Sequence, residues 1–159
     1  MIKGLHYNNV AEGDKWEFGV LVMKKKKITV FVVMIIIVVI VIGVWYSTPK
    51  RFLGPVKASE VISISVFDGN TGKGFTIDDS DEIKQIIENI QSIEMKRDNF
   101  SIGYSGYSFS MEFMNENGRV IDSFIINSSN TIRDDPFFYR SDKDLCFDYL
   151  KGLEDSYVK

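Results

Sequence analysis

The hydrophobic pattern changes several times along the chain, and the first feature is an uninterrupted apolar run. The nineteen residues from Ile28 to Tyr46 carry no charged side chain, and thirteen of them are Val or Ile. A lone strand in a bilayer would leave its backbone amides unpaired, so a run of this kind forms a helix there. At about 1.5 Å per residue it spans roughly 28 Å, close to the hydrocarbon thickness. The run predicts a transmembrane helix over residues 28–46.

The next pattern is an alternation of apolar residues and serine over residues 61–67, which is the period of a half-buried strand. The glycine-rich stretch 68–74 supplies turn residues, and residues 75–77 can return as the second strand of a hairpin. The apolar positions of the first strand are Ile62, Ile64 and Val66.

Five isoleucines then recur at helical spacing, which predicts a helix from about Ser80 to Ser92. Asp79 and Ser80 are both suitable N-cap residues, and the acidic residues of the first turn suit the positive end of the helix dipole. The apolar stripe consists of Ile83, Ile86, Ile87, Ile90 and Ile93.

The remaining chain returns to a period of two and ends in a second helical pattern. Large apolar residues alternate with polar ones over 107–114, which predicts a strand, and Asn117-Gly118 is a pair typical of tight hairpins. The further predicted elements are a strand over 120–126, a short strand over 131–133, and a helix over 142–153 with Ser141 as its cap and Cys146, Tyr149, Leu150 and Leu153 on one face.

This order of elements predicts an α+β fold with one N-terminal transmembrane helix, followed by a mainly antiparallel sheet covered on one face by two helices. The number of residues after the apolar run suffices for one small domain. The predicted organisation is a short cytoplasmic tail over 1–27, the transmembrane helix over 28–46, a linker with two prolines over 47–55, and an extracytoplasmic α+β domain over 56–159.

The charges beside the apolar run predict its orientation. Lys24 to Lys27 precede it directly, Trp45 and Tyr46 end it as an interfacial aromatic pair, and fewer basic residues follow it than precede it. We therefore expect the N-terminus in the cytoplasm and the domain outside. A cleaved signal peptide is the main alternative, but the run is long and lacks a small-x-small cleavage pattern. No Cys follows the run to accept a lipid, so an uncleaved signal anchor is the better interpretation.

Residues 1–22 show no helical or alternating period, and Met23 stands directly before the lysines. A basic start leading into an apolar region is typical of an export segment. Two interpretations stay open: residues 1–22 are not translated, because Met23 is the initiator, or they form a disordered cytoplasmic tail.

Candidate chemistry is sparse. One His and one Cys in different segments argue against a zinc site, a disulfide framework or a Cys-His dyad. The stretch 68–74 has neither the spacing of a phosphate-binding loop nor the ligands of a calcium loop, since Lys73 precedes Gly74 and Gly72 offers no side-chain ligand. We therefore expect no cofactor, no metal and no catalytic residue. The 13 basic and 19 acidic residues of 47–159 argue against nucleic acid as a partner, because phosphate binding needs a basic surface.

Two aromatic stretches, 103–109 and 137–139, are candidates for recognition of a peptide or a sugar, because Tyr beside small polar residues makes adaptable binding surfaces. The alternative is that these rings fill the space between sheet and helices. Alternation with Phe109 predicts that Tyr107 is buried, whereas Tyr104 lies beyond a glycine and should be exposed. The candidate recognition surface is Tyr104, Tyr107, Phe138 and Tyr139.

Five segments of the chain form a recognisable combination: the lysine-started apolar span, V-I-S-I-S-V-F-D-G-N-T-G-K, D-S-D-E-I-K-Q-I-I-E-N-I, G-Y-S-G-Y-S-F-S-M-E-F and F-F-Y-R. Together they resemble small single-pass membrane proteins and lipoproteins of Gram-positive bacteria with one extracytoplasmic α+β domain, a group of unknown function. The resemblance covers most of residues 23–153 and brings no activity with it. It implies a bacterial membrane protein.

The sequence thus favours a membrane-anchored extracytoplasmic binding domain without catalysis. Its expected partners are the lipid bilayer and a cell-surface protein or envelope component. Two alternatives stay open: an envelope hydrolase whose site is assembled only in three dimensions, and a small-ligand sensor with an apolar pocket.

Overall fold

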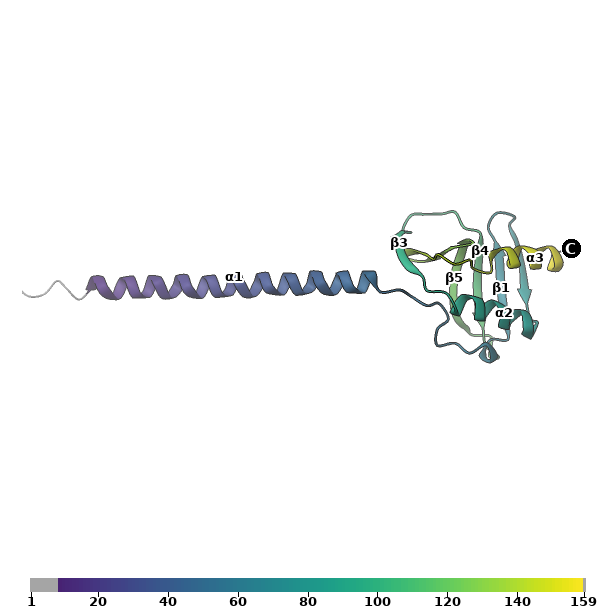
Figure 1. Cartoon of the computed structure of the whole chain (residues 1–159), viewed down its shortest axis with the longest axis horizontal. Coiled ribbons are helices and arrows are strands. Elements are labelled where there is room, and N and C mark those ends of the chain that lie inside the picture. Colours follow the sequence, from purple (N-terminus) through teal and green to yellow (C-terminus); the bar gives the residue numbers. More distant parts are fainter. Residues whose placement is uncertain (1–8, 159) are drawn as a thin grey trace, which may run out of the picture. The chain divides into compact units, whose positions relative to one another are not determined.

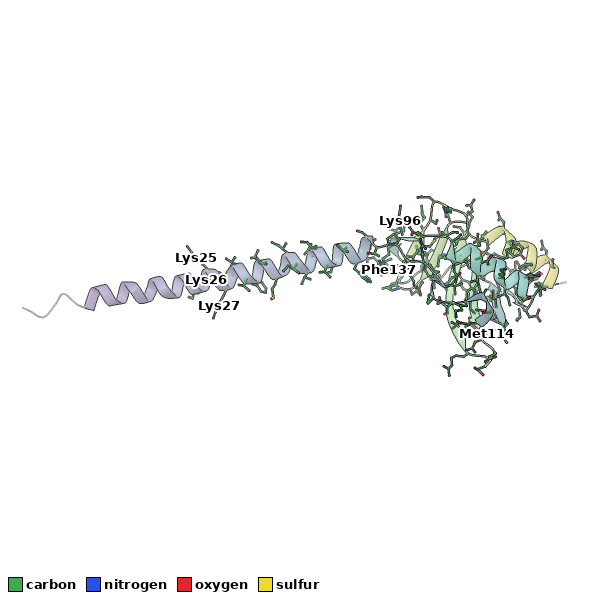
Figure 2. The ribbon with its side chains drawn as sticks, turned by 60° about the horizontal axis from the view of Figure 1, so that its bottom comes forward. Lys25, Lys26, Lys27, Lys96, Met114 and Phe137 are labelled. Atoms are coloured by element: carbon green, nitrogen blue, oxygen red, sulfur yellow. The ribbon has the colours of Figure 1, made fainter. Side chains whose placement is uncertain are left out.

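The computed structural model describes residues 9–158, which divide into two units between Tyr46 and Ser47 (Figure 1). The described part of the first unit is helical and belongs to α1 (Asn9–Ser47), whose last residue is the first of the second unit. Its part from Lys24 to Ser47 is long and apolar enough to cross a membrane, and its side chains are exposed all round (Figure 2). The predicted N-terminal apolar helix is therefore confirmed. Its length and composition fit a membrane anchor and a signal sequence alike.

Residues 9–22 belong to α1, which contradicts the interpretation of this stretch as a disordered tail, whereas translation from Met23 stays a prediction. Residues 1–8 of the predicted cytoplasmic tail lie outside the described residues. The sequence pattern missed the helix because Gly13 and Gly19 interrupt any apolar stripe there.

The second unit is one antiparallel seven-stranded sheet with helices, so the predicted α+β fold is confirmed. The strand order is β2-β1-β4-β5-β6-β7-β3. The strands are β1 (Ser63–Asp68), β2 (Lys73–Ile77), β3 (Lys96–Phe100), β4 (Phe109–Met114), β5 (Val120–Ser128), β6 (Thr131–Asp134) and β7 (Phe137–Arg140). The helices are η1 (Ala58–Glu60), a single 3₁₀ turn, α2 (Ser80–Gln91) and α3 (Phe147–Tyr157).

The predicted hairpin of β1 and β2 forms around a loop that uses its polar residues for its own backbone. The Asp68 carboxylate accepts hydrogen bonds from the backbone N–H and the side-chain amide of Asn70, at 2.7 and 3.0 Å. Gly72 has a φ of +71°, a conformation that favours glycine. The glycines of this loop therefore serve a turn.

Helix α2 starts and packs as its sequence predicts. Asp79 is the N-cap, and its carboxylate accepts from the N–H groups of Asp81 and Glu82 at 2.9 and 3.0 Å. Four isoleucines of the stripe are buried within the helix, and Ile93 is buried just beyond its end. Burying such a stripe against the sheet is what stabilises a helix of this length.

The hairpin of β4 and β5 confirms two predicted strands but uses a longer turn than Asn-Gly suggests. Gly118 donates its N–H to the Asn115 carbonyl at 2.9 Å, and Asn115 donates to the Arg119 carbonyl at 3.0 Å. Only Gly118 of this loop has a positive φ, +68°, and the register of the two strands shifts between Phe113, which pairs with Asp122, and Met114, which pairs with Val120. The connection is thus a four-residue turn with a bulge, one of the common longer hairpin loops.

Helices α2 and α3 cover the same face of the sheet (Figure 1). The strand residues that point toward them are buried in one continuous apolar core, and the residues between them point to the opposite face. We call the opposite side the open face. Its residues from the central strands include Phe67, Ser110, Glu112, Ser123, Arg133 and Phe138.

The predicted linker over 47–55 is wrong, because most of it belongs to the domain. Lys50 pairs with Met95 through two backbone hydrogen bonds of 2.8 and 2.9 Å. Phe52 and Leu53 lie in the core, and the Gln91 side chain donates to the carbonyl of Leu53 at 2.7 Å. We call residues 48–56 the strap. Its prolines and glycine suggested a linker, but its apolar side chains fill the core beside α2.

The last helix begins later than predicted. The Ser141 hydroxyl does not cap it but accepts from the Lys143 N–H at 2.9 Å, and Leu145 donates to the Ser129 carbonyl at 2.6 Å. These bonds hold residues 141–145 in a loop against the sheet, so α3 starts at Phe147 with Cys146 as its N-cap. Leu150 and Leu153 are buried as expected, whereas Tyr149 is only half-buried.

Candidate recognition surface

Tyr104 lies on the open face, where Arg133 holds the loop that carries it. The Arg133 guanidinium donates to the carbonyl oxygens of Tyr104 and Gly106, at 3.0 and 3.3 Å. Its Nε lies 3.2 Å from the Asp135 carboxylate, which fixes its direction. The Tyr104 ring packs edge-on against Phe138 at 5.2 Å and remains 54% exposed. The structure thus brings Tyr104 and Phe138 together, and Tyr104 is exposed as predicted.

Tyr107 lies on a different part of the open face and is half-buried, so the prediction that it is buried is wrong. Strand β4 begins only at Phe109, and the alternation therefore does not extend to Tyr107. The ring instead packs 6.2 Å from Phe67 and over Gly69, where an added Cβ would lie 2.6 Å from the Tyr107 carbonyl oxygen. Gly69 has to lack a side chain for this packing.

Tyr139 is not part of the surface. It is 4% exposed and lies on the helix-covered face, edge-on to Phe52 at 5.2 Å. Because side chains alternate along a strand, Phe138 and Tyr139 of β7 point to opposite faces. The same alternation in the sequence excludes a shared surface for these two neighbours.

A groove of ≈ 290 Å³ lies on the open face, between the Phe67–Tyr107 pair and the Tyr104–Phe138 pair. Phe67 and Arg133 also belong to this surface, but the sequence analysis did not predict them. The exposure of Phe67 could have been predicted, because it lies out of phase with the buried residues of β1, whereas nothing in the sequence marks Arg133. The groove is lined by Ser110, Glu112, Ser123, Phe124, Ile125, Arg133, Asp134 and Asp135. Asp134 and Asp135 are ion-paired with Lys50 and Arg133, so Glu112 is the remaining charge of the lining, which favours a neutral polar or cationic occupant.

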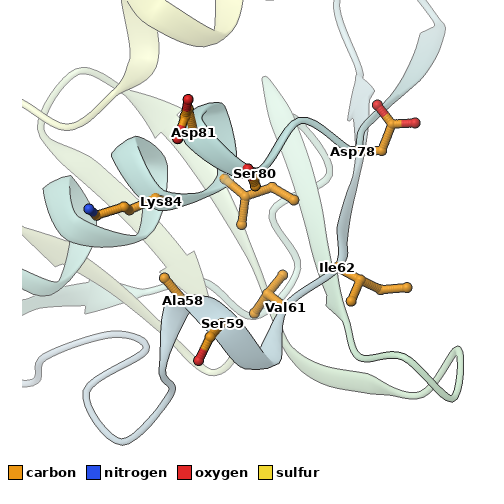
Figure 3. Close-up of a pocket in the computed structure, with 9 residues that line it drawn as sticks. Ala58, Ser59, Val61, Ile62, Asp78, Ser80, Asp81 and Lys84 are labelled. Carbon is orange, nitrogen blue, oxygen red and sulfur yellow. The ribbon is translucent and has the colours of Figure 1, made fainter.

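A second groove, of ≈ 460 Å³, lies between η1 and the start of α2 (Figure 3). Its acids, Asp78 and Asp81, lie well apart on separate segments (Figure 3). Ile62 lines it and is 50% exposed, so the prediction that Ile62 points into the core is wrong. Strand β1 begins one residue later, at Ser63.

The buried polar side chains of residues 24–158 serve the fold. Asp68 holds the first hairpin loop, Ser141 holds the loop before α3, and Ser101 donates to the Asp135 carboxylate. Burial raises the pKa of the Cys146 thiol to about 12, so this Cys stays protonated. No group of three or more His, Cys, Asp or Glu side chains that could hold a metal occurs in the part of the chain that the structure describes. His6 lies outside the described residues.

Lys50 of the strap and two carboxylates of the sheet, Asp122 and Asp134, form a charged cluster. Lys50 is ion-paired with Asp134, and its ammonium lies 4.3 Å from the centre of the Phe52 ring. Burial raises the pKa of the neighbouring Asp122, and this effect exceeds the lowering by its hydrogen bond to the Ser123 N–H and by Lys50. The charged form of Asp122 is therefore disfavoured by folding.

This shift predicts a pH-dependent effect of Asp122→Asn. A carboxyl whose pKa is higher in the folded state lowers the free energy of unfolding above that pKa, because the folded chain then holds a desolvated charge. This cost disappears at low pH, where the carboxyl is protonated in both states. The variant should unfold at an equal or higher temperature than the wild type at pH 7, and this difference should fall toward pH 3. Asn keeps the acceptor for Ser123. Thermal unfolding between pH 3 and 7 tests this, and a variant that is less stable only at neutral pH would contradict it.

Comparisons with protein families, with curated proteins and with solved structures find no match for this chain.

Proposed function

We propose that the chain is a single-pass membrane protein whose domain, from Ser47 onward, lies outside the cytoplasm and binds a partner there without catalysis. The uncleaved helix α1 is its anchor, with the N-terminus in the cytoplasm. The partner is a cell-surface protein or another envelope component. The observation that carries the binding role is the uncovered face of the sheet, with exposed aromatic rings on two sides of a polar groove.

The anchor is supported by the side chains of α1. From Ile28 to Tyr46 its large apolar side chains are all exposed, and a soluble helix with such a surface would not stay in water (Figure 2). Lys24 to Lys27 at its amino end and the Trp45–Tyr46 pair at the other end match the two interfaces of a cytoplasmic-to-outside span.

The Tyr104 side chain is held in place as well as exposed, and both properties support the binding role. Arg133 bonds to two carbonyls of the loop that carries Tyr104, and Phe138 supports its ring. An aromatic side chain fixed in this way loses little conformational entropy when a partner binds. An open sheet face supports such a role better than it supports a small-ligand sensor, because the described grooves are open to solvent and not enclosed.

Replacing Tyr104 by serine is expected to weaken partner binding with little loss of stability. Aromatic residues at the centre of an interface cost about 2 kcal/mol or more when truncated, a loss of roughly 30-fold in affinity. An exposed substitution changes the free energy of unfolding by less than about 0.5 kcal/mol. The measurement is photocrosslinking in intact cells from a benzophenone side chain placed at Phe138, with and without Tyr104→Ser.

The matched control is Ile62→Ser, which removes an apolar side chain of similar exposure from the groove beside η1. Adducts at Phe138 should fall with Tyr104→Ser and persist with Ile62→Ser. Equal adduct yield in all three proteins would reject the open face as the binding surface.

A further inference from the structure

The end of β3 and the turn that follows it present the two most exposed large apolar side chains that the structure describes. Ile102 is 76% exposed and Phe100 is 68% exposed. Ile102 stands at the corner of a β-turn that Tyr104 closes by donating its N–H to the Ser101 carbonyl at 3.0 Å. Gly103 follows with a φ of +83°, the conformation that the third position of a type II turn requires. The turn directs Ile102 into solvent.

This loop is fixed at its base. Ser101 is buried, its N–H donates to the Pro136 carbonyl at 2.9 Å, and its hydroxyl donates to the Asp135 carboxylate. The Phe100 ring lies 5.0 Å from Phe137, whose own ring is buried. The apolar side chains therefore cannot fold back into the core, which is already filled beneath them.

Short contacts link this loop to the first residues after α1. Arg97 donates to the Thr48 carbonyl at 3.3 Å, and its guanidinium lies 5.7 Å from the centre of the Phe137 ring. Since the Phe137 ring lies 5.0 Å from the Phe100 ring, these contacts keep Phe100 within roughly 15 Å of the Thr48 carbonyl. Thr48 directly follows Ser47, the last residue of α1, and Lys50 is already paired with Met95. Three residues of chain reach at most about 10 Å.

We propose that Phe100 and Ile102 form a second membrane contact, in which the loop over residues 100–103 rests in the interface of the outer leaflet. This inference rests on the proposed function, because it needs α1 to span the bilayer. If α1 does so, the short connection keeps the loop within reach of the headgroups. A lipid surface then accounts for two apolar side chains that are rigidly exposed.

The contact between the loop and the lipid surface can be weak and still form most of the time. Two apolar side chains bind a bilayer poorly on their own, but a short covalent tether makes the contact intramolecular, with an effective concentration in the millimolar range. Charge contributes little, because Lys96 lies 3.9 Å from Asp142 and Arg140 lies 3.2 Å from Asp98. We therefore expect a contact that persists at high salt.

The test places an environment-sensitive NBD fluorophore on Ile102→Cys in the full chain, reconstituted at one chain per lipid nanodisc. The control position is Asn117→Cys, an exposed residue in the β4–β5 turn. Cys146 is buried and stays unlabelled. At position 102 we expect blue-shifted emission, quenching by doxyl-labelled lipids, and no change at 0.5 M salt. At position 117 we expect emission typical of water.

The possible outcomes distinguish a failure of the proposed lipid contact from a failure of the proposed membrane anchor. Water-like emission at 102 in a chain that is retained in the disc overturns the lipid contact and leaves the anchor intact. A blue shift that appears only with two chains per disc, without lipid quenching, assigns the loop to a second copy and also overturns it. Failure of the chain to enter nanodiscs at all refutes the anchor itself.

Discussion

Replacing Phe52 by alanine should destabilise the domain by about 3 to 5 kcal/mol, which lowers its unfolding temperature by roughly 10 to 20 °C. The ring is 2% exposed and lies edge-on to Phe124 at 5.1 Å and to Tyr139 at 5.2 Å. Its removal leaves a cavity between the strap and the sheet. Thermal unfolding of the purified full chain in detergent, followed by near-ultraviolet circular dichroism, measures the effect.

The matched control is the neighbouring residue. Arg51 is exposed and pairs with Glu94 at 2.6 Å on the surface, so Arg51→Ala should change the free energy of unfolding by less than about 1 kcal/mol. If residues 47–55 were a linker, both variants would unfold like the wild type. For the same reason, a fragment starting at Val56 should not fold cooperatively, whereas one starting at Thr48 retains the strap.

Arginine at both Ile36 and Ile37 should remove the chain from the membrane. Each arginine at the centre of a span costs roughly 2.5 to 3.5 kcal/mol of insertion free energy, and each lost isoleucine removes a favourable contribution. The sum is comparable to the several kcal/mol by which the apolar run favours insertion. Carbonate-washed membranes should contain the wild type but little of the double variant.

Leucine at the same two positions is the control, since it keeps the run apolar, and it should leave the protein in the washed membranes. Retention of the double-arginine protein would mean that something other than α1 holds the chain to the membrane. The domain itself would then be the place to look for the attachment.

The elements that were predicted correctly are those whose own sequence determines them. The isoleucine stripe of α2 has one face that must be buried, and Asp79 begins the helix through its own side chain. The two hairpins have loops rich in glycine and asparagine, which restrict the chain to a turn. In each case the local preference and the final packing agree.

The elements that were missed depend on distant partners. Strand β3 has the sequence Lys-Arg-Asp-Asn-Phe and lies at the edge of the sheet, where polar residues are tolerated and no alternation is needed. The strap belongs to the core because Phe52 packs against Phe124 of β5 and Tyr139 of β7, which are distant in the sequence. The start of α3 is delayed by a hydrogen bond from Leu145 to the distant Ser129.

The candidate surface was predicted in part for the same reason. Exposure of Tyr104 followed from its position beyond the alternating segment. Tyr107 was misplaced because alternation fixes which residues share a face but does not fix where the strand begins. Arg133 could not be identified, because its importance comes from carbonyl groups of a loop more than twenty residues earlier in the chain.

Protease accessibility tests the central claim most directly. Protease added outside intact cells whose wall has been removed should digest the domain beyond about residue 50, and mass spectrometry should recover a membrane-bound peptide that includes Lys24 to Tyr46. This result would show an uncleaved helix with the domain outside. Protection of the domain, or recovery of an intact domain whose N-terminus lies directly after Tyr46, would contradict the account.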